Sequence, residues 1–168
     1  MPSDSWQSRN KRVIEFSGPV WRILFQSQAG SPLDPARAPE GRFHHHGQSA
    51  LYASLSEEGA GIAIRRYVSA GDPARVIQRC QVTASLHDLR GRSEVSLVWQ
   101  DITAADLPSP TWAYSDKARA IGAQGMLYSS RSRPDLSHLV LFDITPTTIR
   151  TVGQPHPWHP DAYLSLDP

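Results

Sequence analysis

The chain has almost none of the residues that build covalent cross-links, and no segment of membrane-spanning length. Its only cysteine, Cys80, excludes an internal disulfide framework and a cysteine-based zinc site. Because Cys80 lies in the apolar run 76–82, we predict a buried structural thiol rather than a nucleophile. No apolar stretch approaches the ~20 residues of a membrane-spanning helix, and the N-terminus lacks the apolar core of a signal peptide. We therefore expect a cytoplasmic protein that does not bind membranes.

An excess of charge of one sign is also missing. Seventeen basic residues face 16 acidic ones, and the formal net charge of +1 gives no field that would attract nucleic acid. No basic stripe with interleaved aromatic residues occurs either, so we expect no nucleic-acid partner. Lysine is nearly absent, since Lys11 and Lys117 are the only two. Arginine favours fork-shaped recognition of phosphate or carboxylate, although a GC-rich genome would produce the same bias.

The sequence motifs of several common enzyme classes are absent as well. Neither G-x-G-x-x-G nor G-x-x-x-x-G-K-[ST] occurs, which argues against a kinase, a GTPase or a Rossmann dehydrogenase. Serine, histidine and aspartate are all present, but no G-x-S-x-G elbow places a serine as the nucleophile of an α/β-hydrolase.

The length of 168 residues fits one domain, and 14 prolines with 11 glycines predict many turns. Helices are expected from Ser56, as N-cap, through Tyr67, and from Trp112 to Ile121 with Gly122 as the cap. The segment 26–41 reads as loop and the tail from Gly153 as irregular. Short strands around two helices, without regular βαβ alternation, favour an α+β fold with mainly antiparallel sheets. Strands are predicted at residues 13–16, 20–25, 51–54, 76–82, 86–89, 125–128, 138–142 and 148–152.

Residues 41–47 read Gly-Arg-Phe-His-His-His-Gly and directly precede the strand that carries Tyr52. So many polar groups beside a core strand indicate a ligand, and an anionic one in particular. In an extended segment His44 and His46 would share one side while His45 points away. Two histidines with a distant carboxylate could hold zinc or iron, but no nearby acidic pattern completes such a site. We therefore expect no metal there, and we assign the imidazoles to hydrogen bonding with a polar ligand or the loop backbone.

Two segments carry the best candidates for a nucleotide pocket. Arg42 would emerge beside Tyr52 if the two segments form adjacent strands, giving a guanidinium for phosphate and a ring for stacking. Residues 127–135 place hydroxyls and two arginines at a strand exit, ready for a second phosphate or a ribose. The alternative for that segment is a strand end followed by a solvated loop.

Taken in order, these segments resemble the RES-domain family, the toxin components of bacterial Xre–RES (ParS–ParT type) toxin–antitoxin pairs. The resemblance implies an ADP-ribosyltransferase-like fold that consumes NAD+ as its substrate. It also implies a cognate antitoxin that blocks the pocket. The acceptors of ADP-ribose that the resemblance implies are water, phosphate or a protein such as phosphoribosyl pyrophosphate synthetase, and the sequence leaves open which of them applies. We treat residues 1–168 as one such domain with its core at about 20–145. The matching motifs are residues 20–23, 41–44, 51–54, 125–131 and 139–142.

The resemblance also assigns roles to individual residues. It makes Arg42 and Tyr52 catalytic. The family's glutamate falls by spacing on Ala63, so we place the catalytic carboxylate on Glu58, one of two acids at the start of the same helix. Two other hypotheses stay open: a non-catalytic nucleotide-binding module that lost the glutamate, and a histidine-metal hydrolase. The substrate-binding set implied is Arg22, His44, His46, Ser129 or Ser130, and Arg131.

Overall fold

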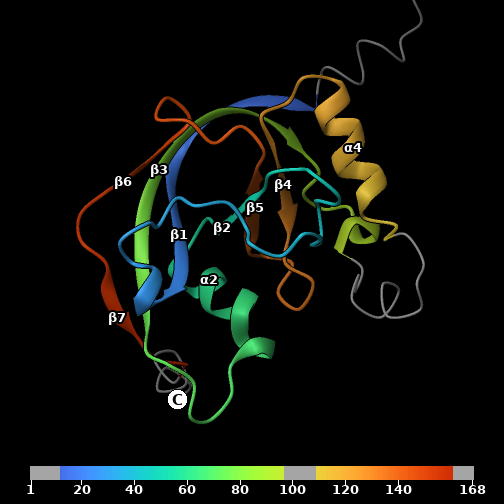
Figure 1. Cartoon of the computed structure of the whole chain (residues 1–168). Helices are drawn as coiled ribbons and strands as arrows, with labels where there is room; N and C mark the ends of the chain where they lie inside the picture. Colours follow the sequence, from blue (N-terminus) through green and yellow to red (C-terminus); the bar gives the residue numbers. More distant parts are fainter. Residues whose placement is uncertain (1–11, 97–108, 161–168) are drawn as a thin grey trace, which may run out of the picture.

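The computed structural model describes residues 12–96 and 109–160 and shows one mixed sheet with helices packed against it (Figure 1). The α+β class predicted from the sequence is confirmed. The strands are β1 (Val13–Phe25), β2 (Leu51–Ser54), β3 (Arg75–Asp88), β4 (Gly125–Ser129), β5 (Ser137–Leu141), β6 (Ile149–Thr151) and β7 (His156–Trp158). The helices are α2 (Glu57–Ile64) and α4 (Trp112–Ala120), with 3₁₀ turns η1 (Gln26–Gln28), η2 (Arg65–Tyr67) and η3 (Ser93–Ser96).

The sheet closes on itself through its two long strands. Its order is β1-β2-β5-β4-β3, and β1 also pairs with β3 from Val13↔His87 to Phe25↔Arg75. The other edge of β3 pairs in turn with β7, β6 and β4. Among these pairings only β3–β4 is parallel, so the expectation of a mainly antiparallel sheet is confirmed.

Tertiary pairing extends the predicted strands. The two strands expected in the first 25 residues form the single strand β1, and those expected at 76–82 and 86–89 form β3. Each long strand supplies the other with a continuous hydrogen-bonding partner, which carries the pairing across polar positions. The tail is not irregular throughout, because β7 pairs with β3 and its Trp158 is 6% exposed against Ala60 and Ile77.

The short strands β2, β5 and β4 have two buried faces, because their alternate residues pack into different clusters. On one face, Leu51, Leu127 and Leu139 pack together with Cys80, which is fully buried and belongs to β3. Burial raises the pKa of the Cys80 thiol to about 11, which suits the structural role predicted for it. The opposite face, formed by Met126, Tyr128 and Val140, packs against Phe43 and α4.

The helix ends follow local signals in the sequence. The Ser56 side chain accepts a hydrogen bond from Gly59 N at 2.9 Å, so the predicted N-cap of α2 is confirmed. α2 ends at Ile64 and continues as the 3₁₀ turn η2 rather than reaching Tyr67 as an α-helix. Gly122, at φ +82°, follows α4 as predicted. Across the described residues, neither helix has the length and apolar character needed to cross a bilayer.

Candidate functional site

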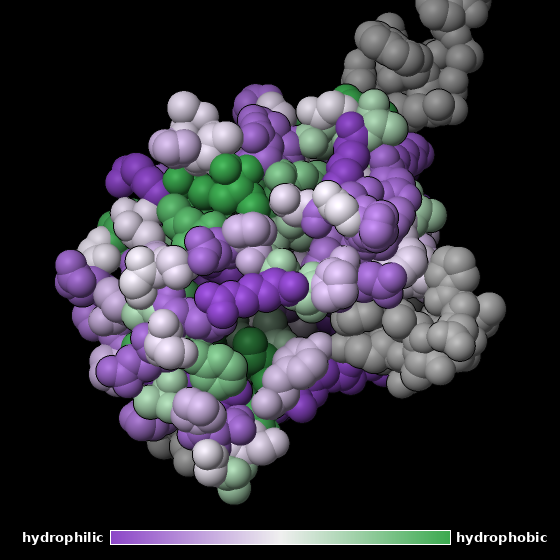
Figure 2. Space-filling view, viewed as in Figure 1, coloured by the Kyte–Doolittle hydropathy of each residue, from purple (hydrophilic) through white to green (hydrophobic). Residues whose placement is uncertain are grey.

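A cavity of about 910 Å³ opens between α2, the loop before β2 and the β4–β5 connection. Figure 2 shows a recess on the face seen in Figure 1, with hydrophilic side chains around it and hydrophobic ones within it. Its size lies in the range of small-molecule and cofactor sites. The lining residues are Ala36, Ala38, Glu40–Arg42, His44, Tyr52, Ile62–Tyr67, Tyr128, Ser130–Ser132 and His138.

Two neighbouring side chains of the short strands, His138 and Tyr128, form part of the cavity wall, and Ser54 lies behind His138 in the same row. The register pairs Ser54 of β2 with His138 of β5, and His138 with Tyr128 of β4. Ser54 Oγ lies 2.7 Å from His138 Nδ1, and the His138 and Tyr128 ring centroids are 5.5 Å apart. Burial, reinforced by the charge of Arg42, lowers the pKa of His138 to about 4, so its imidazole is neutral at pH 7.

Sequence reasoning did not select Tyr128 or His138 as site residues. A signal was available, because alternation along β4 and β5 puts both on the face that carries Tyr52. His138 is also the polar residue at an inward position of a strong apolar strand. Burial raises the pKa of Tyr128 to about 12, with Arg42 acting in the opposite direction.

Tyr52 connects β2 to the loop that carries Arg42. Its phenol oxygen accepts a hydrogen bond from Phe43 N at 2.9 Å and lies 2.7 Å from His44 Nδ1. His44 Nε2 lies 2.8 Å from the Ala38 carbonyl, which can only accept, so Nε2 donates there and Nδ1 is left to accept the hydrogen bond from the Tyr52 hydroxyl. Burial raises the pKa of Tyr52, which keeps that proton in place. Arg42 and Tyr52 therefore line one cavity, brought together by a turn rather than by adjacent strands.

Helix α4 fixes the same loop from its outer side. Trp112 Nε1 donates to Gly41 O at 2.8 Å, and Arg119 donates to Phe43 O at 3.0 Å. Thr111 Oγ1 donates to the Arg42 carbonyl. The Arg42 guanidinium carbon then lies 5.5 Å from the centre of the Tyr128 ring, within the range of a cation–π contact.

The three consecutive histidines have separate environments, because residues 41–47 form a turn and not an extended strand. His44 is 2% exposed and is held by Tyr52. His45 Nε2 lies 2.9 Å from Asp116 and its ring stacks on Trp112 at 4.7 Å. His46 is exposed and does not line the cavity. Within residues 12–96 and 109–160, no group of three or more His, Cys, Asp or Glu side chains is placed to hold a metal ion.

Other predicted substrate-binding residues fall in different places. Ser130 and Arg131 line the cavity. Ser129 does not, and its hydroxyl instead accepts from Gly91 N at 2.9 Å. Arg22 lies outside this cavity as well: its Nε donates to Tyr52 O at 3.0 Å and its guanidinium faces a second, smaller cavity.

The carboxylate expected on α2 has a different neighbour. Glu58 Oε1 pairs with Arg133 Nη1 at 2.9 Å, and Arg133 also pairs with Asp135 at 2.8 Å. These contacts tie the β4–β5 connection to α2, and Glu58 is not among the lining residues. Ala63, where the family glutamate falls, is on the cavity wall. Of the acidic residues in the described part of the chain, Glu40 is the one that lines the cavity.

The lining is strongly cationic. It contains four guanidinium groups and one carboxylate, which belong to Arg42, Arg65, Arg66, Arg131 and Glu40. Guanidinium groups bind phosphate through paired hydrogen bonds, and the neighbouring tyrosines offer surfaces for ring stacking. The arrangement suits a ligand that carries phosphate groups together with an aromatic ring.

Comparison with known proteins shows the family and the fold of this chain. A family model described as the RES domain matches residues 19–162, so the chain belongs to the RES-domain family. The match includes every segment that lines the cavity. No match was found among the curated proteins. Among solved structures, the fold resembles the M. tuberculosis MbcT–MbcA toxin–antitoxin complex, with a TM-score of 0.70 and 21% identity over 95% of this chain and 94% of that chain.

Proposed function

We propose that this protein is the toxin of a toxin–antitoxin pair and that it cleaves the nicotinamide–ribose bond of NAD+. The observation that carries the proposal is the arginine-lined and tyrosine-lined cavity in a RES-domain fold. NAD+ offers two phosphates for the arginines and two ring systems for the tyrosines. The similar solved structure is a toxin–antitoxin complex, which supports a cognate antitoxin as the partner of this chain. An intracellular substrate also fits the cytoplasmic location predicted from the sequence.

In this proposal Arg42 binds the diphosphate, and Arg131, which also lines the cavity, supplies a second cation. Tyr52 packs against the nicotinamide end, and the Ser130 hydroxyl hydrogen-bonds the nicotinamide ribose or amide. His44 acts through Tyr52, since its imidazole accepts the phenol proton. Holding NAD+ by both ends orients the glycosidic bond and lowers the entropic cost of reaching the transition state.

The reaction breaks the bond between the ribose C1′ and the nicotinamide nitrogen. The bonding electron pair leaves with nicotinamide, which becomes neutral, and positive charge develops on C1′ and the ring oxygen. An acceptor oxygen then attacks C1′ and releases its proton. Water gives ADP-ribose, phosphate gives a phosphorylated ADP-ribose, and a protein acceptor such as phosphoribosyl pyrophosphate synthetase becomes ADP-ribosylated.

Developing positive charge is stabilised by a nearby carboxylate. Glu58 was the sequence-based candidate, but it pairs with Arg133 and is not among the residues that line the cavity. Glu40 lies on the cavity wall two residues before Arg42, so we assign to it the stabilisation of the ribosyl cation and the hydrogen bonds to the ribose hydroxyls.

The test is release of free nicotinamide from NAD+ by the purified protein, with buffer alone, with phosphate and with candidate acceptor proteins. We expect the wild-type protein to release nicotinamide and R42A to release none. R150A, which replaces an exposed arginine of β6, is the control and should release nicotinamide at the wild-type rate. The three reaction mixtures identify the acceptor. Absence of turnover in every mixture would contradict the proposal.

The second candidate is a binding module without catalysis, and the uncharged Ala63 on the cavity wall is the observation that favours it. Such a module would bind NAD+ in an Arg42-dependent manner and release no nicotinamide. Measuring NAD+ affinity and nicotinamide release on the same wild-type and R42A samples separates the two functions.

A further inference from the structure

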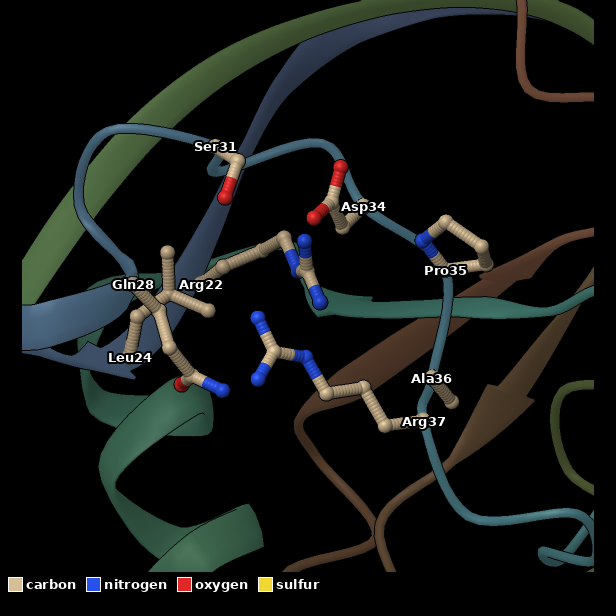
Figure 3. A pocket seen from close by; sticks show the side chains of 8 residues that line it. All are labelled: Arg22, Leu24, Gln28, Ser31, Asp34, Pro35, Ala36 and Arg37. Atoms are coloured by element: carbon tan, nitrogen blue, oxygen red, sulfur yellow. The ribbon is translucent and has the colours of Figure 1, made fainter.

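A second, smaller cavity lies beside the first and is lined by Arg22, a predicted site residue that the proposed function does not use. Its volume is about 140 Å³, and Ala36 lines both cavities. The side chains in it come from β1, from η1 and from the loop that leads to Arg42 (Figure 3). The lining residues are Arg22, Leu24, Gln28, Ser31, Asp34, Pro35, Ala36 and Arg37.

Arg22 is a partly buried cation whose hydrogen bonds go to uncharged groups. Its Nε donates to Tyr52 O at 3.0 Å, and its Nη1 donates to the Pro32 carbonyl. Among the described residues Arg22 has no carboxylate within ion-pair distance, and Asp34 interacts with it only at longer range. Removing a guanidinium from water is costly unless an anion compensates its charge.

A second guanidinium points into the same space. In Figure 3 the Arg37 side chain extends from the loop toward the guanidinium of Arg22, and both groups face the cavity. The Ser31 hydroxyl and the Gln28 amide lie on its wall. Two guanidinium groups that point into one small cavity repel each other. An anion bound between them would offset this repulsion, because each guanidinium could form charge-assisted hydrogen bonds with it.

We propose that this cavity is a binding site for a small tetrahedral oxyanion, either free phosphate or the terminal phosphate of a larger molecule. Arg22 and Arg37 bind the oxyanion from opposite sides, and Ser31 and Gln28 donate the remaining hydrogen bonds. Asp34 opposes the anion and so limits its affinity. A hydrogen bond links this site to the main cavity, because the Arg22 guanidinium also donates to the backbone carbonyl of Tyr52, which lines the main cavity.

The test is a phosphate titration of the ¹⁵N-labelled protein, with sodium chloride of equal ionic strength as the salt control. We expect saturable shifts of the Ser31 amide and of the Arg22 and Arg37 Nε signals with phosphate and not with chloride. R37A removes a charge-assisted partner and should weaken the phosphate affinity at Ser31 by about tenfold or more. Because Arg37 is exposed, we expect this variant to fold.

Two further variants sharpen the result. D34N should tighten phosphate binding, because it removes the opposing charge. R131A alters the main cavity, where phosphate could also bind, and should leave the Ser31 response unchanged. A second titration with AMP identifies the source of the oxyanion: a response to phosphate alone indicates the free ion, and a response to both indicates a terminal phosphate group.

The proposal is overturned if phosphate produces no saturable shift at Ser31 and Arg22, or if R37A leaves the response at wild-type strength. These readouts detect binding directly, so they do not depend on whether NAD+ is cleaved.

Discussion

The phenol oxygen of Tyr52 and Nδ1 of His44 lie 2.7 Å apart, and this hydrogen bond joins strand β2 to the loop that carries Arg42. The same phenol oxygen accepts a hydrogen bond from the backbone of Phe43, whose side chain is fully buried. The position of the arginine in the cavity therefore depends on a tyrosine that also lines it.

Replacing Tyr52 with phenylalanine should both destabilise the protein and impair the site. Y52F leaves the Phe43 N–H and His44 Nδ1 without their partner, which costs about 1–3 kcal/mol of unfolding free energy. Nicotinamide release should fall as well, because the loop no longer holds Arg42 in place. Urea denaturation and the nicotinamide assay measure the two effects. Y114F, outside the cavity lining, is the control, and equal stability of Y52F and wild type would contradict this role.

Gly41 is required by close packing at the same point. A Cβ at this position would collide with the His44 ring and would lie 2.7 Å from its Nδ1 and 3.0 Å from Tyr52 Oη. G41A should therefore lower the melting temperature and the rate of nicotinamide release together. G30A is the matched control, because a Cβ there has nothing within 4 Å. If G41A and G30A had the same melting temperature and activity, the prediction would be wrong, and the loop would tolerate displacement of the His44 ring.

The two candidate carboxylates can be compared directly. If Glu40 stabilises the ribosyl cation, E40Q should reduce kcat by about 10²–10³, the usual effect of removing one electrostatic contact to a transition state. E58Q removes only the half-exposed ion pair with Arg133, outside the cavity lining, and should retain most of kcat. Steady-state nicotinamide release checks both variants. The opposite ranking would return the catalytic role to Glu58 while leaving NAD+ cleavage itself intact.

His138 should make stability depend on pH. Its pKa is lowered to about 4 in the folded protein from an ordinary 6.5, so below pH 6.5 the unfolded chain takes up a proton that the folded protein does not. The unfolding free energy is therefore unaffected by the protonation of His138 above pH 6.5. It falls by up to about 3 kcal/mol as the pH decreases from 6.5 toward 4.

Denaturation of wild type and H138N at several pH values between 7 and 4.5 isolates this contribution, because the other titrating groups are common to both proteins. The difference in unfolding free energy should shrink as the pH falls. A difference that stays constant with pH would show that His138 is protonated normally in the folded state.

Local patterns in the sequence were sufficient for several elements. The apolar runs of β2, β4 and β5, the Ser56 cap of α2 and the glycine after α4 each depend on neighbouring residues, and all were predicted. The motif order around Arg42 and Tyr52 also led to the RES-domain family, which the family match confirms.

The sequence by itself determined which residues could bind an anion, because guanidinium chemistry and the alternation of a strand are local properties. Tertiary structure decided which of them share a cavity. Pairing of β5 with β2 and β4 placed His138 and Tyr128 on the wall, whereas the expected acid, Glu58, pairs with Arg133 and does not line the cavity. Arg22 was separated from Arg42 in the same way, because β1 directs its side chain to the smaller cavity. Contacts between residues that are far apart in the chain form only when all the strands have paired. The spacing of residues along the sequence therefore does not predict them.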